Sequence, residues 1–146
     1  MRWLIGRMPP SLLLAALLLA GCGVKTDCTT ARDFIKSYAR AHQKGDVQAI
    51  IKMKAPLGLL EGMDIDPALK EELEGYSLDR EREELKQGFR DGDRWLTAWK
   101  NTEYKSEQDH GDYLRVEVLV GGHPSSVVLV RDGEFLRIHP RPSWFD

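Results

Sequence analysis

The chain has 146 residues, and its 21 Lys and Arg side chains nearly balance 23 Asp and Glu, which leaves a formal charge of −2 at pH 7. The first 21 residues contain two basic and no acidic side chains, so the other 125 residues carry 19 basic and 23 acidic ones, a formal charge of −4. This balance argues against nucleic acid and against anionic lipid headgroups as main partners. A segment of 125 residues suffices for one domain, and two would be crowded.

The N-terminus has the three-part layout of an export signal. Arg2 and Arg7 precede an apolar run over residues 12–20, and small residues follow that run. The run is too short to cross a bilayer, which takes about 20 apolar residues. We therefore predict that residues 1–21 are a signal peptide.

The end of the signal, residues 19–22 (LAGC), resembles the lipobox of bacterial lipoproteins. The resemblance implies cleavage before Cys22, diacylglycerol on its sulfur, labelling by palmitate and stable attachment to a membrane. Gly23 stands where aspartate would retain an enteric-type lipoprotein at the inner membrane, so in a Gram-negative host we expect the outer membrane, facing the periplasm. An ordinary secretory signal or an uncleaved anchor with a chance cysteine is the alternative.

The lipidated tether predicted for residues 22–29 is short and polar. From Gly23 onward its seven residues reach about 25 Å when fully extended, which keeps the following domain close to its membrane. Cys28 is the one thiol left after lipidation, so no internal disulfide can form. We interpret Cys28 as an unreactive tether residue, with an intermolecular bridge or a reactive thiol as alternatives. The domain itself is predicted over residues 30–146.

A first helix is predicted to begin at Thr30, whose hydroxyl can cap it while Asp33 reaches back in a variant of the capping box. Gly45 provides the stop signal. The apolar residues of this stretch fall on one face at helical spacing: Phe34, Ile35, Tyr38 and Ala39.

Further helices follow in the first two thirds of the chain. Asp46 can cap a short one that buries Val47, Ile50 and Ile51 and ends before Pro56. The sequence Asp-Pro at residues 66–67 restarts a helix, and another is predicted at about residues 79–90, with a dense and mainly solvated charged face.

After Gly92 the pattern changes to a period of two residues. Residues 99–108 are predicted as a polar strand or hairpin arm, and residues 113–120 alternate cleanly between two faces. Strands over residues 126–131 and 134–139 follow, joined by a hairpin turn at Asp132-Gly133. Helices first and a meander last predict an α+β fold, in which N-terminal helices pack on a curved antiparallel sheet of three to four strands.

Two short stretches carry a family likeness: residues 34–39 (FIKSYA) leading into 45–47 (GDV), and residues 131–138 (RDGEFLRI). They resemble the nuclear transport factor 2-like superfamily over about residues 30–140, and small bacterial lipoproteins of unassigned function are among its members. A cystatin-like fold is the close alternative. The resemblance implies a cone with a pocket between sheet and helices, in which enzymes of the superfamily use Asp, His or Tyr.

No residue can be matched to such a catalytic position, so no catalytic residue is predicted. Residues expected inside the cone are aromatic: Tyr38, Trp95, Trp99 and Tyr104. Asp109, His110 and Asp112 form a polar turn that points outward. His123 and His139 share one end of the predicted sheet and could pair into an anion or weak metal site, but we predict no metal site and no cofactor.

The function that these features favour is a noncatalytic, membrane-anchored envelope module that binds a small apolar ligand or a partner protein. The candidate ligand or partner residues are Leu57, Leu59, Leu60, Met63 and Trp99. Four of them belong to an apolar stretch, residues 57–65, that can act as a lid over the cone, as a partner surface, as a membrane contact or as plain core. A small enzyme using the same pocket is one alternative, and an envelope stress or assembly factor is another.

Overall fold

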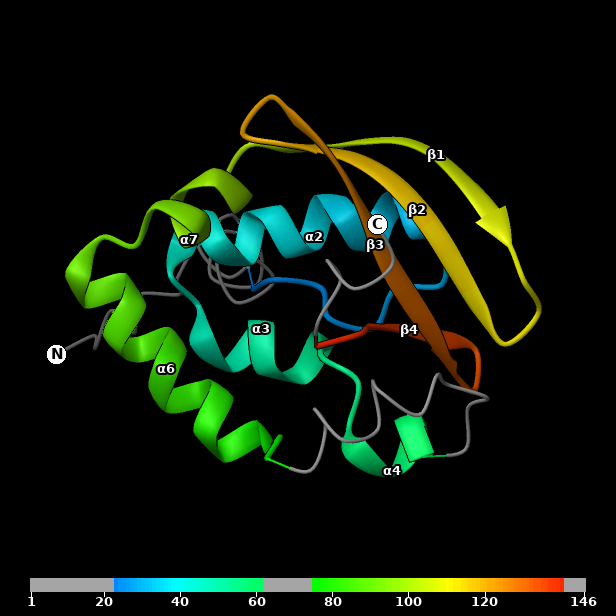
Figure 1. The fold of residues 1–146 in the computed structure, drawn as a ribbon, viewed down its shortest axis with the longest axis horizontal. Coiled ribbons are helices and arrows are strands. Elements are labelled where there is room, and N and C mark those ends of the chain that lie inside the picture. The colour runs from blue at the N-terminus through cyan, green and yellow to red at the C-terminus, as the bar shows by residue number, and fades with distance from the viewer. Residues whose placement is uncertain (1–22, 62–74, 141–146) are drawn as a thin grey trace, which may run out of the picture.

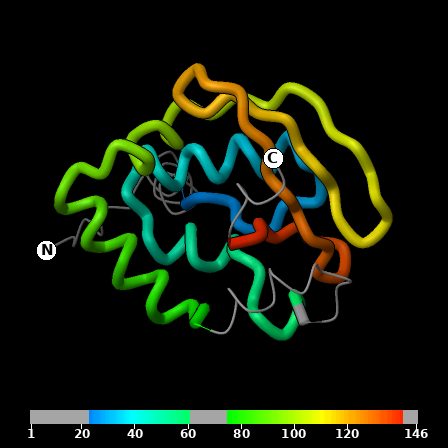
Figure 2. The backbone as a smooth tube through the Cα atoms, in the orientation of Figure 1, coloured from blue at the N-terminus to red at the C-terminus, as the bar shows by residue number. Residues whose placement is uncertain are grey.

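The computed structural model describes residues 23–61 and 75–140. In chain order the helices are α2 (Ala31–Lys44), α3 (Val47–Met53), α4 (Leu57–Glu61), α6 (Leu78–Asp91) and α7 (Arg94–Trp99). The strands are β1 (Thr102–Asp109), β2 (Tyr113–Val120), β3 (His123–Asp132) and β4 (Phe135–Ile138). Figures 1 and 2 show α2 lying under the curved sheet, with α3 and then α6 below it. The signal peptide, Cys22, Met63 and the helix predicted at residues 66–67 fall outside the described residues.

The sheet is an antiparallel meander with the strand order β1-β2-β3-β4. One of the two alternating faces of β2 lies on the helix side of the sheet, and its residues are all buried: Leu114, Val116, Val118 and Val120. They pack with Phe34 and Ile35 of α2 and with Ile50 and Met53 of α3. The predicted α+β fold is confirmed, because helices pack on one face of a four-stranded antiparallel sheet.

The N-terminal boundaries of the first two helices follow the predicted caps. The Thr30 hydroxyl accepts from the Asp33 amide at 3.2 Å, and the Asp46 carboxylate accepts from the Ala49 amide at 3.1 Å. Gly45 ends α2 with a φ of 61°, a left-handed conformation that glycine adopts without steric cost. The tight corner between α2 and α3 is therefore encoded locally.

Two predictions about the second half of the chain were wrong. Residues 94–99 form helix α7 rather than part of a period-two segment, because the Asp93 carboxylate accepts from the amides of Trp95 and Leu96 and starts a new helix. The last hairpin turns at Gly133-Glu134, one residue later than predicted, because Asp132 still pairs with Phe135 and the positive φ of 61° falls on Gly133.

The N-terminal segment before α2 packs on the domain. The Leu136 amide of β4 donates to the Cys28 carbonyl at 2.9 Å, and the Arg137 guanidinium bonds the Thr26 carbonyl at 3.2 Å and the Asp27 carboxylate at 2.9 Å. Cys28 is fully buried, and its thiol lies 3.6 Å from the Ser37 hydroxyl. Residues 26–28 of the predicted tether are thus fastened to the last strand.

The burial of Cys28 predicts a slow thiol. We expect the protein lacking the signal and Cys22 to react with a thiol reagent at least about a hundredfold more slowly when folded than in denaturant, because opening the segment must precede reaction. Ellman's reagent, followed with and without guanidinium, measures this. Equal rates in the two conditions would show that residues 24–28 do not stay packed.

Candidate functional site

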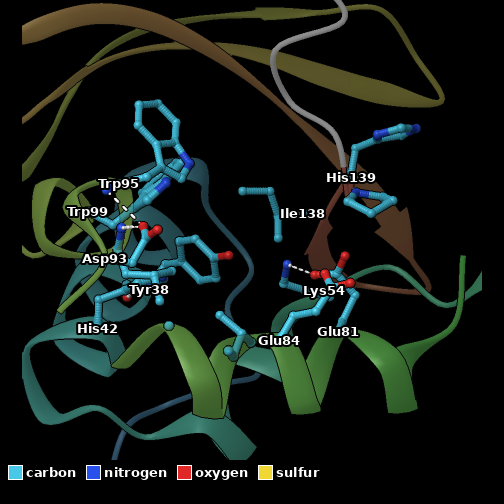
Figure 3. Close-up of a pocket in the computed structure, with 14 residues that line it drawn as sticks. Tyr38, His42, Lys54, Glu81, Glu84, Asp93, Trp95, Trp99, Ile138 and His139 are labelled. Carbon is cyan, nitrogen blue, oxygen red and sulfur yellow. Dashed lines mark hydrogen bonds and ion pairs between the residues drawn. The ribbon is translucent and has the colours of Figure 1, made fainter. Parts of the chain in front are cut away.

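A pocket of about 260 Å³ lies between the helices and the end of β4 (Figure 3). Its lining comes from α2, α6, α7, the C-terminal side of α3 and the chain that leaves β4. The lining residues are Tyr38, His42, Lys54, Glu81, Glu84, Leu85, Gly88, Asp93, Trp95, Leu96, Trp99, Ile138, His139 and Pro140. The pocket is therefore built from segments that lie up to about a hundred residues apart in the sequence. They meet next to the end of β4.

One wall of the pocket is aromatic. Tyr38 meets Trp99 edge-on with ring centroids 5.2 Å apart, and the His42 ring stacks on Trp99 at 5.8 Å. Trp95 meets Trp99 edge-on at 6.0 Å. Trp99 is buried, whereas Trp95 is 51% exposed and stands at the mouth. Such a wall favours flat apolar groups and, through the ring faces, cations.

His42 is a buried, neutral imidazole. Its Nδ1 lies 2.8 Å from the Tyr38 carbonyl, and because a carbonyl can only accept, Nδ1 carries the proton and Nε2 is an acceptor. Burial lowers the pKa of His42 to about 4; the bond to the Tyr38 carbonyl opposes this shift, and Lys54 and Lys100 add to it. The side chain therefore stays uncharged at neutral pH.

Opposite the aromatic wall lies an ion pair. The Lys54 ammonium is 2.7 Å from the Glu81 carboxylate, and the two side chains are only 10% and 17% exposed. Lys54 is positioned by β4, since it forms a parallel bridge with Ile138 and the next amide, that of Ala55, donates to the Ile138 carbonyl at 2.8 Å. Removal of one partner would leave a buried charge uncompensated, so the pair is expected to persist.

The Tyr38 hydroxyl points from the aromatic wall toward this ion pair (Figure 3). Burial raises the pKa of Tyr38; Lys54 lowers it and Glu81 raises it by smaller amounts. The phenol is therefore a protonated group that can donate a hydrogen bond to a bound molecule.

The residues predicted from the sequence divide between two places. Trp99 lines the pocket together with Tyr38 and Trp95, as expected for cone residues, whereas Tyr104 lies on β1 outside it. Leu57, Leu59 and Leu60 of α4 pack with Val128 and Val130 on the other face of the sheet, away from the pocket. Met63 lies outside the described residues. The leucines of α4 thus cover the outer face of β3 rather than the mouth of the pocket.

Several pocket residues had not been singled out from the sequence, among them His42, Lys54 and Glu81. His42 is four residues after Tyr38 and shares its helical face, and Lys54 ends an apolar run, so both carried a weak signal. Nothing local marks Glu81 on the charged helix α6. Only the packing of α6 against α3 brings it to Lys54.

The histidines considered near the ends of the strands do not pair with one another, although His139 lines the pocket. His110 stacks on Tyr113 at 4.7 Å in an exposed turn, where the pKa of Asp109 is lowered by hydrogen bonds from the Gly111 amide and from Arg131. His139 is buried and its amide bonds the Val128 carbonyl, five residues along β3 from the exposed His123. Among the described residues no three His, Cys, Asp or Glu side chains are grouped closely enough to hold a metal ion.

Comparisons with known proteins found no counterpart: no protein-family model matches the chain, and searches of curated proteins and of solved structures found no match. Within residues 23–61 and 75–140, no helix has the length and apolar character needed to cross a membrane.

The burial of neutral His42 predicts a specific pH dependence of stability. Because its pKa is about 4 when folded and near 6.5 when unfolded, its contribution is complete above pH 6.5 and is lost as the pH falls toward 4. We expect a loss of about 2 kcal/mol in the free energy of unfolding between about pH 7.5 and pH 5 from this residue.

The measurement is urea denaturation of the wild type and of His42→Phe, which keeps an aromatic ring in the stack, at several pH values. The variant should lose that part of the pH dependence, while the contributions of the other histidines cancel in the comparison. If the free energy of unfolding changes with pH in the same way in both proteins, the assignment of this pH dependence to His42 is contradicted.

Proposed function

We propose that this chain is a bacterial envelope lipoprotein, anchored through lipid on Cys22, whose domain is a noncatalytic binding module for a small ligand. The anchor rests on the signal pattern of residues 1–22. The binding role rests on one observation, a pocket with an aromatic wall facing a buried ion pair. In a Gram-negative host, Gly23 after the lipidated cysteine supports an outer-membrane location facing the periplasm. A pocket between helices and sheet is also what the resemblance to the nuclear transport factor 2-like superfamily implies.

The size of the pocket limits the ligand. An apolar cavity of about 150 Å³ holds benzene, and pockets for drug-sized ligands begin at about 300 Å³. A volume of about 260 Å³ therefore suits a molecule of one or two rings. With so few atoms, a dissociation constant on the order of 1 mM is expected for a simple one-ring probe.

The charges around the pocket favour a neutral or cationic ligand over an anion. Lys54 is already paired with Glu81, and the acidic Glu84 and Asp93 also line the pocket. An anion would meet these carboxylates, of which Glu84 is paired with Arg80 at 2.9 Å, whereas a cation would find them and the exposed ring of Trp95. The Tyr38 hydroxyl can donate a hydrogen bond to a neutral polar group.

An enzyme using the same pocket is the second candidate, because His42 is a buried titratable group oriented by the Tyr38 carbonyl. A base with a pKa of about 4 is weak at neutral pH, so binding is the better supported role. A partner protein, as for an envelope assembly factor, would find the exposed ring of Trp95 at the pocket mouth.

The ligand preference can be tested with three probes of equal size: benzylamine, benzyl alcohol and benzoate. We expect tryptophan fluorescence to report binding in the order benzylamine, benzyl alcohol, then benzoate, because the carboxylate is repelled. Trp95→Ala should weaken benzylamine binding by about threefold to tenfold, the worth of one exposed cation–π contact. Tyr104→Ala, an aromatic change outside the pocket, serves as the control. Equal affinity of both variants, or tightest binding of benzoate, would contradict the assignment.

Lipidation is tested separately by Cys22→Ser. This variant should lose palmitate labelling and leave uncut precursor or soluble protein, since the acceptor sulfur is gone. Cys28→Ser is the matched control and should remain labelled and membrane-bound, because its buried thiol has no part in anchoring. If the Cys22→Ser protein still labels and fractionates with membranes, the lipobox assignment is wrong.

A further inference from the structure

Helix α2 presents a row of four cations to solvent. Arg32, Lys36, Arg40 and Lys44 follow one another at intervals of four residues, and all are exposed. The row spans about 18 Å at 1.5 Å per residue. Asp33 is the only acidic residue of the helix, so these four residues, termed the basic face of α2, dominate its exposed side.

The basic face is bordered by two parts of the chain. On one side, a groove of about 950 Å³ separates it from β1, where the Arg32 guanidinium lies 4.8 Å from the centre of the Tyr104 ring. The one acid lining this groove, Glu103, is paired with Lys105 at 3.4 Å. On the other side, the N-terminal segment passes α2 (Figures 1 and 2). The Cys28 thiol of this segment lies 3.6 Å from the Ser37 hydroxyl of the helix.

The negative net charge of the chain does not reflect the excess of cations on α2. Five acids and one base give residues 62–74 a formal charge of −4, equal to that of the whole chain after residue 21, so the remainder is neutral. Within that neutral remainder α2 carries four cations against one acid, while His42 stays uncharged. The basic face is therefore a local positive surface on a chain that is acidic overall.

The beginning of the chain brings this surface to a membrane, if Cys22 is lipidated as proposed above. The segment is fixed to β4 from Thr26 to Cys28, and Val24 packs on the core. Only Gly23 lies between that packed segment and Cys22, a reach of about 7 Å. The acyl chains thus enter the bilayer next to the segment that borders the basic face.

We propose that the basic face of α2 docks on the anionic phospholipid headgroups of the membrane that holds the lipid anchor. The occupant is argued from charge complementarity and from the place where the chain meets the bilayer. Cations near an anionic bilayer each strengthen binding by up to about fivefold at moderate salt, so four of them can hold the domain against the surface. The attraction must weaken at high salt, where charges are screened over a few ångströms.

The test uses vesicle co-sedimentation of the full mature chain with Cys22→Ser, so that headgroup binding is measured without the lipid. Vesicles of phosphatidylcholine alone are compared with vesicles that contain about 30 mol % phosphatidylglycerol. We expect binding to the anionic vesicles only, and its loss in about 0.5 M NaCl. Changing all four residues of the basic face to Gln should reduce binding by at least about thirtyfold.

A matched control removes the same number of charges from another helix. Arg80, Arg82, Lys86 and Arg90 of α6 supply four cations, of which the first three are paired with Glu84, Asp79 and Glu83. Their change to Gln should leave vesicle binding within about twofold of the parent. Circular dichroism and a melting temperature establish that both quadruple variants are folded.

A second readout uses the lipidated protein itself, reconstituted in the same two kinds of vesicle. Acetylation of Lys36 by an amine reagent should be slowed severalfold in anionic vesicles relative to neutral ones, while Lys86 on α6 reacts equally in both. Because the first assay needs no lipidation, failure of Cys22 to be modified and failure of the basic face to bind are distinguishable.

Three results would overturn the proposal. Equal loss of binding in the two quadruple variants would show a general charge effect. Release by inorganic phosphate at constant ionic strength would indicate a free phosphate site. If the protein does not bind anionic vesicles but binds a polyglutamate peptide, the basic face is a docking surface for an acidic protein.

Discussion

The arrangement of this domain depends on β4, a strand of four residues that joins its hairpin neighbour β3 to two distant parts of the chain. It pairs with β3 through the sheet, its Leu136 amide holds the Cys28 carbonyl, and its Ile138 carbonyl accepts from Ala55 after α3. Backbone hydrogen bonds that are buried must be made within the protein, so each of these contacts specifies where the joined segment lies. The same strand places Lys54 next to the pocket and fastens the N-terminal segment that would follow the proposed lipid anchor.

The features that could be predicted from the sequence are those encoded by residues close together in the chain. The caps of α2 and α3 act over three residues, and the alternation of β2 repeats every two, so both were readable from residue types alone. The turn around Gly133 was displaced by one residue, because either neighbour of the glycine can complete a two-residue loop. Helix α7 was missed because its capping Asp93 stands in a stretch of tryptophans that also suits a strand.

The pocket could be predicted only in part, because it is formed by contacts between segments far apart in the sequence. Its aromatic residues Tyr38, Trp95 and Trp99 had been named as candidates for the interior of the cone that the resemblance implies, but their meeting at one wall could not be read from the sequence. The ion pair joins Lys54 to a glutamate 27 residues later on a helix that carries several equivalent acids, so sequence spacing could not select Glu81. Of the alternatives open for the leucines of α4, packing in a core agrees with their contacts, because a sheet buries apolar side chains on both faces where a helix covers the second one.

The two proposed surfaces have a defined relation to each other. Tyr38 is two residues from both Lys36 and Arg40, which places it about 200° around α2 from each of them. The pocket and the basic face therefore occupy opposite sides of the same helix. A domain docked through the basic face would hold the Tyr38 wall of the pocket on the side of α2 that is turned away from the bilayer. This geometry accords with a lining that includes Glu84 and Asp93, which suits a small water-soluble molecule with a flat ring better than a membrane lipid.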